Sequence, residues 1–186
     1  MITPWGKSQH VERHAEGISF VSTASHGGYH LSRKRLNQMP QYFRKECAEG
    51  AFFEEDCCWC VVPLSFLAQF DDKTVEVAKN TLLNWFPDLY ELHYKTVVTP
   101  KMSMKRREEQ FRRETVTKFV PRACWGDWEE TTPKGFVTVL GERKADGATK
   151  YFLVPDDKYH AQIVCDDFPE SNVNPTGRSK PRRVLC

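Results

Sequence analysis

The sequence predicts an α+β fold in which a small antiparallel sheet packs against a helical middle segment within a single domain. Strand-like runs lie on both sides of that segment, at 11–22 and 135–154. The residues between them, 32–119, carry helix caps and helical spacing of apolar residues. A chain of 186 residues has an ordinary length for one domain. We expect this domain to span 1–165, followed by a basic, flexible C-terminal tail at 166–186.

The first strands are expected at 11–15 and 18–22, joined by a turn at Glu16 and Gly17. The second run, Ile-Ser-Phe-Val-Ser, alternates apolar and polar residues, which is the period of a half-buried strand. The segment that follows, 25–28, has the sequence Ser-His-Gly-Gly. Consecutive glycines tolerate positive φ angles and a close approach of the backbone, so this segment is predicted to be a loop.

The helical middle begins with a short basic helix at 33–39, for which Ser32 is the expected N-cap. Pro40 ends this helix and suits the first position of a second one. A mostly apolar run at 53–70 predicts a further helix, which Pro63 should kink or divide. The acids that open this helix would complement the dipole at its N-terminus.

Two more helices are expected before the strands resume. Asp71 and Asp72 cap a helix at 74–85, whose apolar residues recur at helical spacing. A highly charged helix is predicted over 101–119, with few apolar side chains to bury.

The last part of the chain returns to strands, predicted at 135–141 and 150–154. An Asp-Gly pair between them, inside 145–148, is a hairpin signal. Beyond the hairpin we expect a helical turn at 155–159 and one more edge strand at 162–165.

Hydropathy and cysteine content predict a soluble, cytoplasmic protein without a membrane partner. The longest uncharged apolar run, 57–70, falls short of the roughly 20 residues that a spanning helix needs. The first residues lack the basic-then-apolar layout of a signal peptide. The chain has an odd number of cysteines, seven, and three of them lie within 57–60. This arrangement is typical of buried thiols in a reducing compartment.

The net charge of +2 conceals strong segregation along the chain. Residues 1–45 carry seven basic and two acidic groups, whereas 46–92 carry two basic and ten acidic groups. Such blocks steer a charged partner or neutralise each other across the fold, and both interpretations stay open. A pI near 8.1 excludes a DNA mimic, which needs a strongly acidic surface.

Two patterns have the spacing of metal ligands, and neither predicts a metal or a cofactor. Cys57 and Cys60 form a Cys-x-x-Cys pair, but zinc needs four ligands and a second pair is missing. His10 and His14 are four residues apart, but the glutamate between them is misplaced for a metalloprotease helix. We expect core thiols and surface histidines instead.

Two short segments supply a candidate catalytic site. Its predicted residues are His26, Glu54, Glu55 and Asp56. An imidazole beside two glycines at the end of a strand can serve as general acid or base while the amides of Gly27 and Gly28 hold an anion. A partly desolvated carboxylate would orient the imidazole. The alternatives are a tight turn at 25–28 and acids that merely compensate a helix dipole.

This catalytic hypothesis requires that the loop near residue 26 and the acidic segment near residue 55 meet in space. Cys57 would then lie within reach of His26 as a nucleophile, although a position in the core is the expected one for this thiol.

A second group of residues predicts a binding surface. The basic side chains of 101–119 suit phosphate contacts, but interleaved acids at salt-bridge spacing favour a solvated helix face. The basic tail at 180–183 is an alternative arm for nucleic acid. Tryptophans are frequent anchors of protein interfaces. The candidate binding residues are Trp5, Gly27, Gly28, Arg106, Arg107, Arg112, Arg113, Trp125 and Trp128.

Several different motifs are distributed along most of the chain. They are Pro-Trp-Gly at 4–6, Val-Ser-Thr-Ala-Ser-His-Gly-Gly at 21–28, Glu-Glu-Asp-Cys at 54–57 with Trp59, and Tyr-Phe-Leu-Val-Pro at 151–155. With these motifs the chain resembles an uncharacterised domain family of bacterial plasmids, integrative elements and phages.

The resemblance implies a biological setting and not a mechanism, since no activity of the family carries over. It implies an accessory protein that counters a host defence system, of anti-CRISPR or anti-restriction type, by binding a host protein complex or its nucleic acid. The alternative hypothesis is a small hydrolase or transferase that uses His26 with an acidic partner from 54–56.

Overall fold

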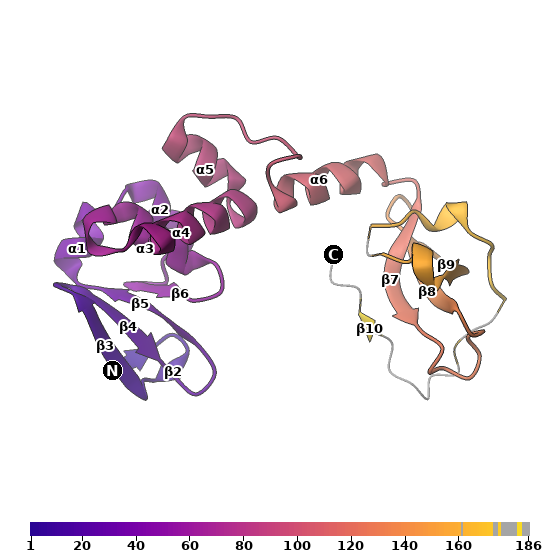
Figure 1. The fold of residues 1–186 in the computed structure, drawn as a ribbon, viewed down its shortest axis with the longest axis horizontal. Helices are drawn as coiled ribbons and strands as arrows, with labels where there is room; N and C mark the ends of the chain where they lie inside the picture. The colour runs from indigo at the N-terminus through magenta and orange to yellow at the C-terminus, as the bar shows by residue number, and fades with distance from the viewer. Residues whose placement is uncertain (161, 173–174, 176–181, 184–186) are drawn as a thin grey trace. The chain divides into compact units, whose positions relative to one another are not determined.

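The computed structural model describes residues 1–186 with the exception of 161, 173–174, 176–181 and 184–186. Its mixture of helices and antiparallel strands confirms the α+β class. The chain divides into two compact units, Met1–Arg107 and Glu108–Cys186 (Figure 1). This division differs from the single domain expected over 1–165, because each unit has its own sheet and its own buried cluster.

The sheet of the N-terminal unit has four antiparallel strands in the order β3-β4-β5-β6. Their bounds are β3 (His10–Ala15), β4 (Ile18–Ser22), β5 (Gly27–Leu31) and β6 (Phe52–Glu54). The predicted strands at 11–15 and 18–22 are therefore confirmed. A separate short hairpin, β1 (Ile2–Thr3) and β2 (Gly6–Lys7), precedes them.

Two helices of this unit begin where the sequence places their caps. Ser32 accepts a hydrogen bond from the backbone N–H of Arg35, and Asp71 accepts one from Thr74. Pro40 is the N-cap of its helix, one position earlier than predicted. The helices are α1 (Arg33–Gln38), α2 (Gln41–Cys47), α3 (Val61–Ser65), α4 (Asp72–Trp85) and α5 (Pro87–Tyr94).

The long helix predicted at 53–70 is wrong. Phe53 pairs with Tyr29 in the ladder between β6 and β5, and only short helical pieces follow. These pieces are η1 (Cys58–Cys60), α3 and η2 (Leu67–Gln69). A short apolar run fits a buried strand as well as a buried helix, so periodicity alone does not separate them. Pro63 lies in the first turn of α3, where its missing N–H costs no hydrogen bond.

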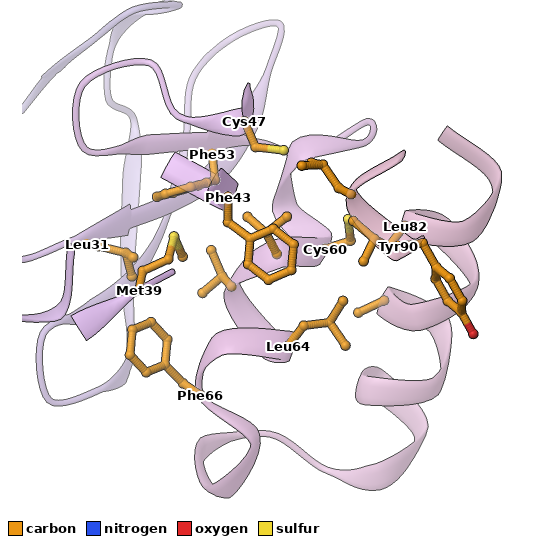
Figure 2. Close-up of a cluster of buried hydrophobic side chains, with 14 of the residues drawn as sticks. Leu31, Met39, Phe43, Cys47, Phe53, Cys60, Leu64, Phe66, Leu82 and Tyr90 are labelled. Carbon is orange, nitrogen blue, oxygen red and sulfur yellow. The ribbon is translucent and has the colours of Figure 1, made fainter. Parts of the chain in front are cut away.

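The core of the N-terminal unit lies between the sheet and the helices. Phe43 of α2 and Phe53 of β6 are both 0% exposed, and Leu82 of α4 completes the contact from the helical side. Figure 2 shows these side chains converging with Leu31 of β5. Burial of each such side chain contributes about 1.5–3 kcal/mol, so this cluster positions β5 and β6 against the helices.

The C-terminal unit contains the second sheet, with antiparallel strands in the order β10-β7-β8-β9. This second sheet differs from the single sheet predicted from the sequence, and strand β7 was not predicted. The elements are β7 (Phe119–Trp125), β8 (Phe136–Arg143), β9 (Ala148–Pro155), η3 (Asp156–Lys158), η4 (Cys165–Asp167) and β10 (Arg182–Arg183). Helix α6 (Met104–Glu114) begins in the first unit and ends in the second, and it is shorter than predicted.

The segment after β9 also differs from the prediction. No strand forms at 162–165, where Cys165 is fully buried and opens η4. The expected tail is attached at its start, because the N–H of Leu153 donates to the carbonyl of Pro169 and that of Ser171 donates to Tyr151. Most of the remaining tail, 180 and 181 included, lies outside the described residues.

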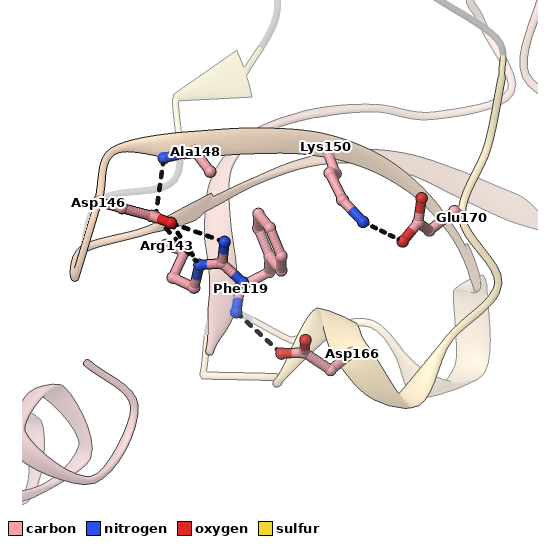
Figure 3. A network of polar contacts seen from close by, with 7 residues as sticks. All are labelled: Phe119, Arg143, Asp146, Ala148, Lys150, Asp166 and Glu170. Carbon is pink, nitrogen blue, oxygen red and sulfur yellow. Dashed lines mark hydrogen bonds and ion pairs between the residues drawn. The ribbon is translucent and has the colours of Figure 1, made fainter. Parts of the chain in front are cut away.

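The hairpin between β8 and β9 follows the Asp-Gly signal and is held by a polar network (Figure 3). Asp146 accepts hydrogen bonds from the Arg143 guanidinium and from the N–H of Ala148, at 3.1 Å for the latter. The Arg143 hydrogen bond lowers the pKa of the Asp146 carboxyl to about 2. The N–H of Phe119 donates to Asp166 at 2.9 Å, which ties η4 to the start of β7.

Strand β5 needs a residue without a side chain at Gly28. A Cβ there would overlap the carbonyl oxygen of Phe53 and lie 2.6 Å from Cη2 of Trp5. The Trp5 ring also packs edge-on against Phe52, with ring centroids 5.9 Å apart. The absence of a side chain therefore lets Trp5 and β6 both lie directly against β5.

Replacing Gly28 by alanine should destabilise the N-terminal unit by about 3 kcal/mol, the upper part of the range for overpacking. Rotation of a side chain cannot relieve an overlap with backbone. Urea denaturation of both proteins measures the change. Ser25→Ala, at an exposed position of the preceding turn, is the control and should stay within about 0.5 kcal/mol of wild type. Equal stability of Gly28→Ala and wild type would contradict this packing.

Candidate functional site

The turn between β4 and β5 is held by Thr23. Its Oγ1 accepts the backbone N–H of His26 at 3.1 Å, and its own N–H donates to the His26 carbonyl at 2.7 Å. These bonds satisfy the backbone of the turn, so the His26 side chain is left at the surface with 49% of its area exposed.

The structure brings His26 and Glu54 together, as the catalytic hypothesis requires. Nδ1 of His26 lies 4.0 Å from Oε1 of Glu54, whose side chain is 25% exposed. The other carboxylate oxygen of Glu54 accepts the N–H of Asp56 at 2.9 Å, so this carboxylate is fixed on the turn after β6. The side chains meet because β6 pairs with β5, and not because acids open a helix.

The other two acids of this segment, Glu55 and Asp56, are exposed. The N–H of Glu55 donates to the carbonyl of Gly27 at 3.0 Å, and its carboxylate lies over Gly27. The structure therefore places Glu54 next to the imidazole and Glu55 above the strand end. The roles assigned to these acids stay predictions.

The glycines of the Ser-His-Gly-Gly motif are strand residues, which corrects the predicted loop. Gly27 and Gly28 begin β5, and both have φ angles outside the left-handed region. Gly28 is paired with Val21 of β4 on one side and with Glu54 of β6 on the other. Because the strand lies inside the sheet, close packing explains these glycines without an anion site.

The cysteines beside the site are thiols and not thiolates. Burial, with the neighbouring Cys58 adding to it, raises the pKa of Cys57 to about 12. The pKa values of Cys58 and Cys60 are raised as well, the first chiefly by its hydrogen bond with Cys47 and the second by burial. Among the described residues, no group of three His, Cys, Asp or Glu side chains could hold a metal ion.

The arginines predicted to bind phosphate divide into two kinds. Arg106 is only 22% exposed and pairs with Asp88 and with Glu91, the latter at 3.2 Å. Arg112 pairs with Glu108 one turn away on the same helix. The other two arginines are different: within the described part of the chain, the side chains of Arg107 and Arg113 form no ion pair.

The three tryptophans predicted as anchors also differ in environment. Trp5 is half-buried against Gly28, and Trp125 is 7% exposed, with a buried Nε1 that has no hydrogen-bond partner among the described residues. Trp128 is 53% exposed. Only the last of these presents a large ring to solvent.

Trp85 is 58% exposed and is not among the residues predicted from the sequence. Helical spacing from the buried Ala78 and Leu82 places Trp85 on the inner face of α4. It is the last residue of that helix, and Phe86 breaks the helical conformation immediately after it. The adjacent Phe-Pro pair is the sequence signal for this exposure. Pro87 marks the end of the helix, and at a helix end a residue with core-facing spacing can lie outside the core.

Trp85 belongs to a surface formed where α4, α5 and the first turn of α6 meet. The N–H of Met104 donates to Oδ1 of Asn84 at 2.9 Å, and Nζ of Lys105 donates to the Trp85 carbonyl at 3.3 Å. Arg106 fixes the same turn to α5. We call this the tryptophan surface, and its exposed residues are Trp85, Leu92, Met104, Lys105 and Arg107.

Arg106→Ala should destabilise the N-terminal unit by about 1–2 kcal/mol, because Asp88 and Glu91 lose a charged hydrogen-bond donor. Arg107→Ala, the adjacent exposed arginine, should change the free energy of unfolding by less than about 0.5 kcal/mol. Urea denaturation of the two variants tests this contrast. A larger loss for Arg107→Ala than for Arg106→Ala would show that the two roles are assigned the wrong way round.

The Cys57 thiol should react slowly with iodoacetamide in the folded chain. At pH 8 a pKa of about 12 leaves roughly one thiolate in ten thousand, against about a quarter for an ordinary cysteine. Alkylation followed by peptide mass spectrometry should therefore be at least about 100-fold slower than in urea. Its rate should rise about tenfold per pH unit from 7 to 10, and a plateau near pH 9 would disprove the raised pKa.

Comparison with known proteins gives a family for the N-terminal part. No curated protein and no solved structure matches the chain. In the described part of the chain, no helix combines the length and apolar character needed to cross a membrane. The sequence model of the family "Domain of unknown function (DUF7007)" matches residues 1–116. This match includes the His26 turn, Glu54 and the tryptophan surface, and the chain therefore belongs to the DUF7007 family.

Proposed function

We propose that this chain is a binding protein that acts on a macromolecular partner and performs no reaction of its own. The partner in this proposal is a host defence complex of restriction or CRISPR type, met in the cytoplasm of a bacterial cell that carries a plasmid or phage. The setting comes from the resemblance to a family of mobile elements, and the mode of action comes from the surface of the N-terminal unit.

The observation that carries the binding proposal is the exposure of Trp85. A tryptophan side chain is among the largest apolar groups in proteins, and hot spots of protein interfaces are enriched in it. Leu92, 56% exposed, and Met104, 66% exposed, lie on the elements bonded to the same helix end. Single exposed apolar residues are ordinary, but a group of them around a tryptophan marks an interaction site.

The environment of His26 gives less support to catalysis. The 4.0 Å between Nδ1 and Oε1 of Glu54 is too long for a hydrogen bond. The adjacent thiol of Cys57 is protonated at neutral pH, and the glycine amides belong to a paired strand. His26 can act as an acid or base. Cys57, however, does not supply a reactive nucleophile, and Gly27 and Gly28 do not supply an oxyanion site.

Capture experiments with purified defence complexes test the proposal. Tagged full-length chain should retain at least one restriction or CRISPR effector complex from a panel, and Trp85→Ala should lose most of this binding. Leu67→Ala is a matched control, since Leu67 is also 58% exposed but lies on η2. His26→Ala should retain the same complex as wild type. If wild type captures none of the complexes, the defence setting is wrong.

A small hydrolase or transferase is the second candidate, favoured by the meeting of His26 with Glu54. In this case Glu54 orients the imidazole, which acts as general acid or base. Screening the full chain against ester, phosphoester and glycoside substrates tests the idea. Turnover that falls at least about 100-fold in both His26→Ala and Glu54→Gln would favour the enzyme, and turnover unaffected by either change would exclude this pair.

A further inference from the structure

We propose that the tryptophan surface binds an acidic, amphipathic helix of its partner protein. This inference rests on the proposed function, because it names the partner chemistry for the same surface. Two properties of the surface lead to it: uncompensated positive charge and the aliphatic character of the side chains around the tryptophan.

The charge around the tryptophan surface is positive. Asp88 and Glu91 of α5 contact Arg106, and Glu108 of α6 pairs with Arg112. Lys105 and Arg107, in the first turn of α6, are exposed. A partner with negative charge would therefore gain from complementarity at this surface.

Each of the three elements that form this surface carries an exposed apolar side chain: Trp85 on α4, Leu92 on α5 and Met104 on α6. Leu92 lies one helical turn after Asp88 on α5, and so on the face that holds Arg106 and the start of α6. Trp85 and Met104 are joined through Asn84 and Lys105. Flexible methionine side chains adapt to the ridges of a docked helix, and an amphipathic helix buries its apolar stripe on such a surface.

The aliphatic residues favour a protein helix over single-stranded nucleic acid. A nucleic-acid strand would find phosphate partners in Lys105 and Arg107, but its bases stack on aromatic faces. Trp85 offers one such face, whereas the other exposed apolar residues of the surface, Leu92 and Met104, offer none. An acidic helix uses both features, with leucine-type residues on the apolar centre and carboxylates on the basic rim.

Selection from a random peptide library tests the proposal directly. Full-length chain is immobilised and exposed to displayed peptides of about 16 residues, enough for four helical turns. We expect enrichment of peptides with apolar residues at i, i+3, i+4 and i+7 and with an excess of Asp and Glu. The most enriched peptide is then labelled and titrated by fluorescence anisotropy.

Variants locate the peptide on the chain. Trp85→Ala should weaken binding about 30-fold, as expected for an interface hot spot, whereas Leu67→Ala should leave it unchanged. The double variant Lys105→Glu/Arg107→Glu should weaken binding about tenfold and reduce its salt dependence. Lys34→Glu, an exposed lysine on α1, is the charge control. Circular dichroism shows that each variant is folded.

Three results would overturn the inference. They are enrichment of basic, neutral or no peptides, equal binding by Trp85→Ala and wild type, and tighter binding of a labelled thymidine oligonucleotide than of any selected peptide. Capture of a defence complex without selection of an acidic helix would refute this inference and leave the proposed function standing. Selection of an acidic helix without capture would support the inference and remove only the defence setting.

Discussion

The pairing of β5 with β6 is the interaction on which the N-terminal unit depends. It brings Phe53 under the helices as part of the core and carries Glu54 to the end of the strand beside His26. The same pairing requires Gly28, because the carbonyl of Phe53 occupies the space that a Cβ would need. A single close contact between backbones thus fixes both the packing of the sheet and the position of Glu54 beside His26.

A second constraint fixes the opposite end of this unit. Arg106 connects α6 to α5, and Asn84 and Lys105 connect it to the end of α4. The basic residues at the start of α6 therefore serve two physical purposes. One guanidinium forms ion pairs with two acids within the fold, and Lys105 and Arg107 are exposed at the surface. Counting basic residues along a helix does not distinguish these purposes, because the acids that pair with Arg106 come from another helix.

The sequence was most informative where a structure depends on neighbouring residues. Caps at Ser32 and Asp71, and the alternating pattern at 18–22, predict their elements because hydrogen bonds and side-chain period act over a few positions. The prediction of a helix at 53–70 was wrong because the strand at its start is defined by pairing with Tyr29, 24 residues before Phe53. No local sequence pattern reveals this pairing. The proximity of His26 and Glu54 was predicted, but the prediction placed Glu54 at the start of a helix, whereas Glu54 ends strand β6.

The exposure of Trp85 is likewise not predictable from local sequence patterns. Helical spacing indicates which residues share a face, but whether that face is covered depends on where the neighbouring elements end. Burying the exposed part of such a ring in an interface would contribute about 1.5–3 kcal/mol, and leaving it in water forgoes that stabilisation. The positive charges beside it lower the tendency of identical chains to associate there, because like charges repel. Exposed apolar side chains beside Lys105 and Arg107, whose neighbouring acids are paired with Arg106, are therefore suited to a partner of opposite charge and poorly suited to a second copy of this chain. This asymmetry is why we assign the surface to a different protein.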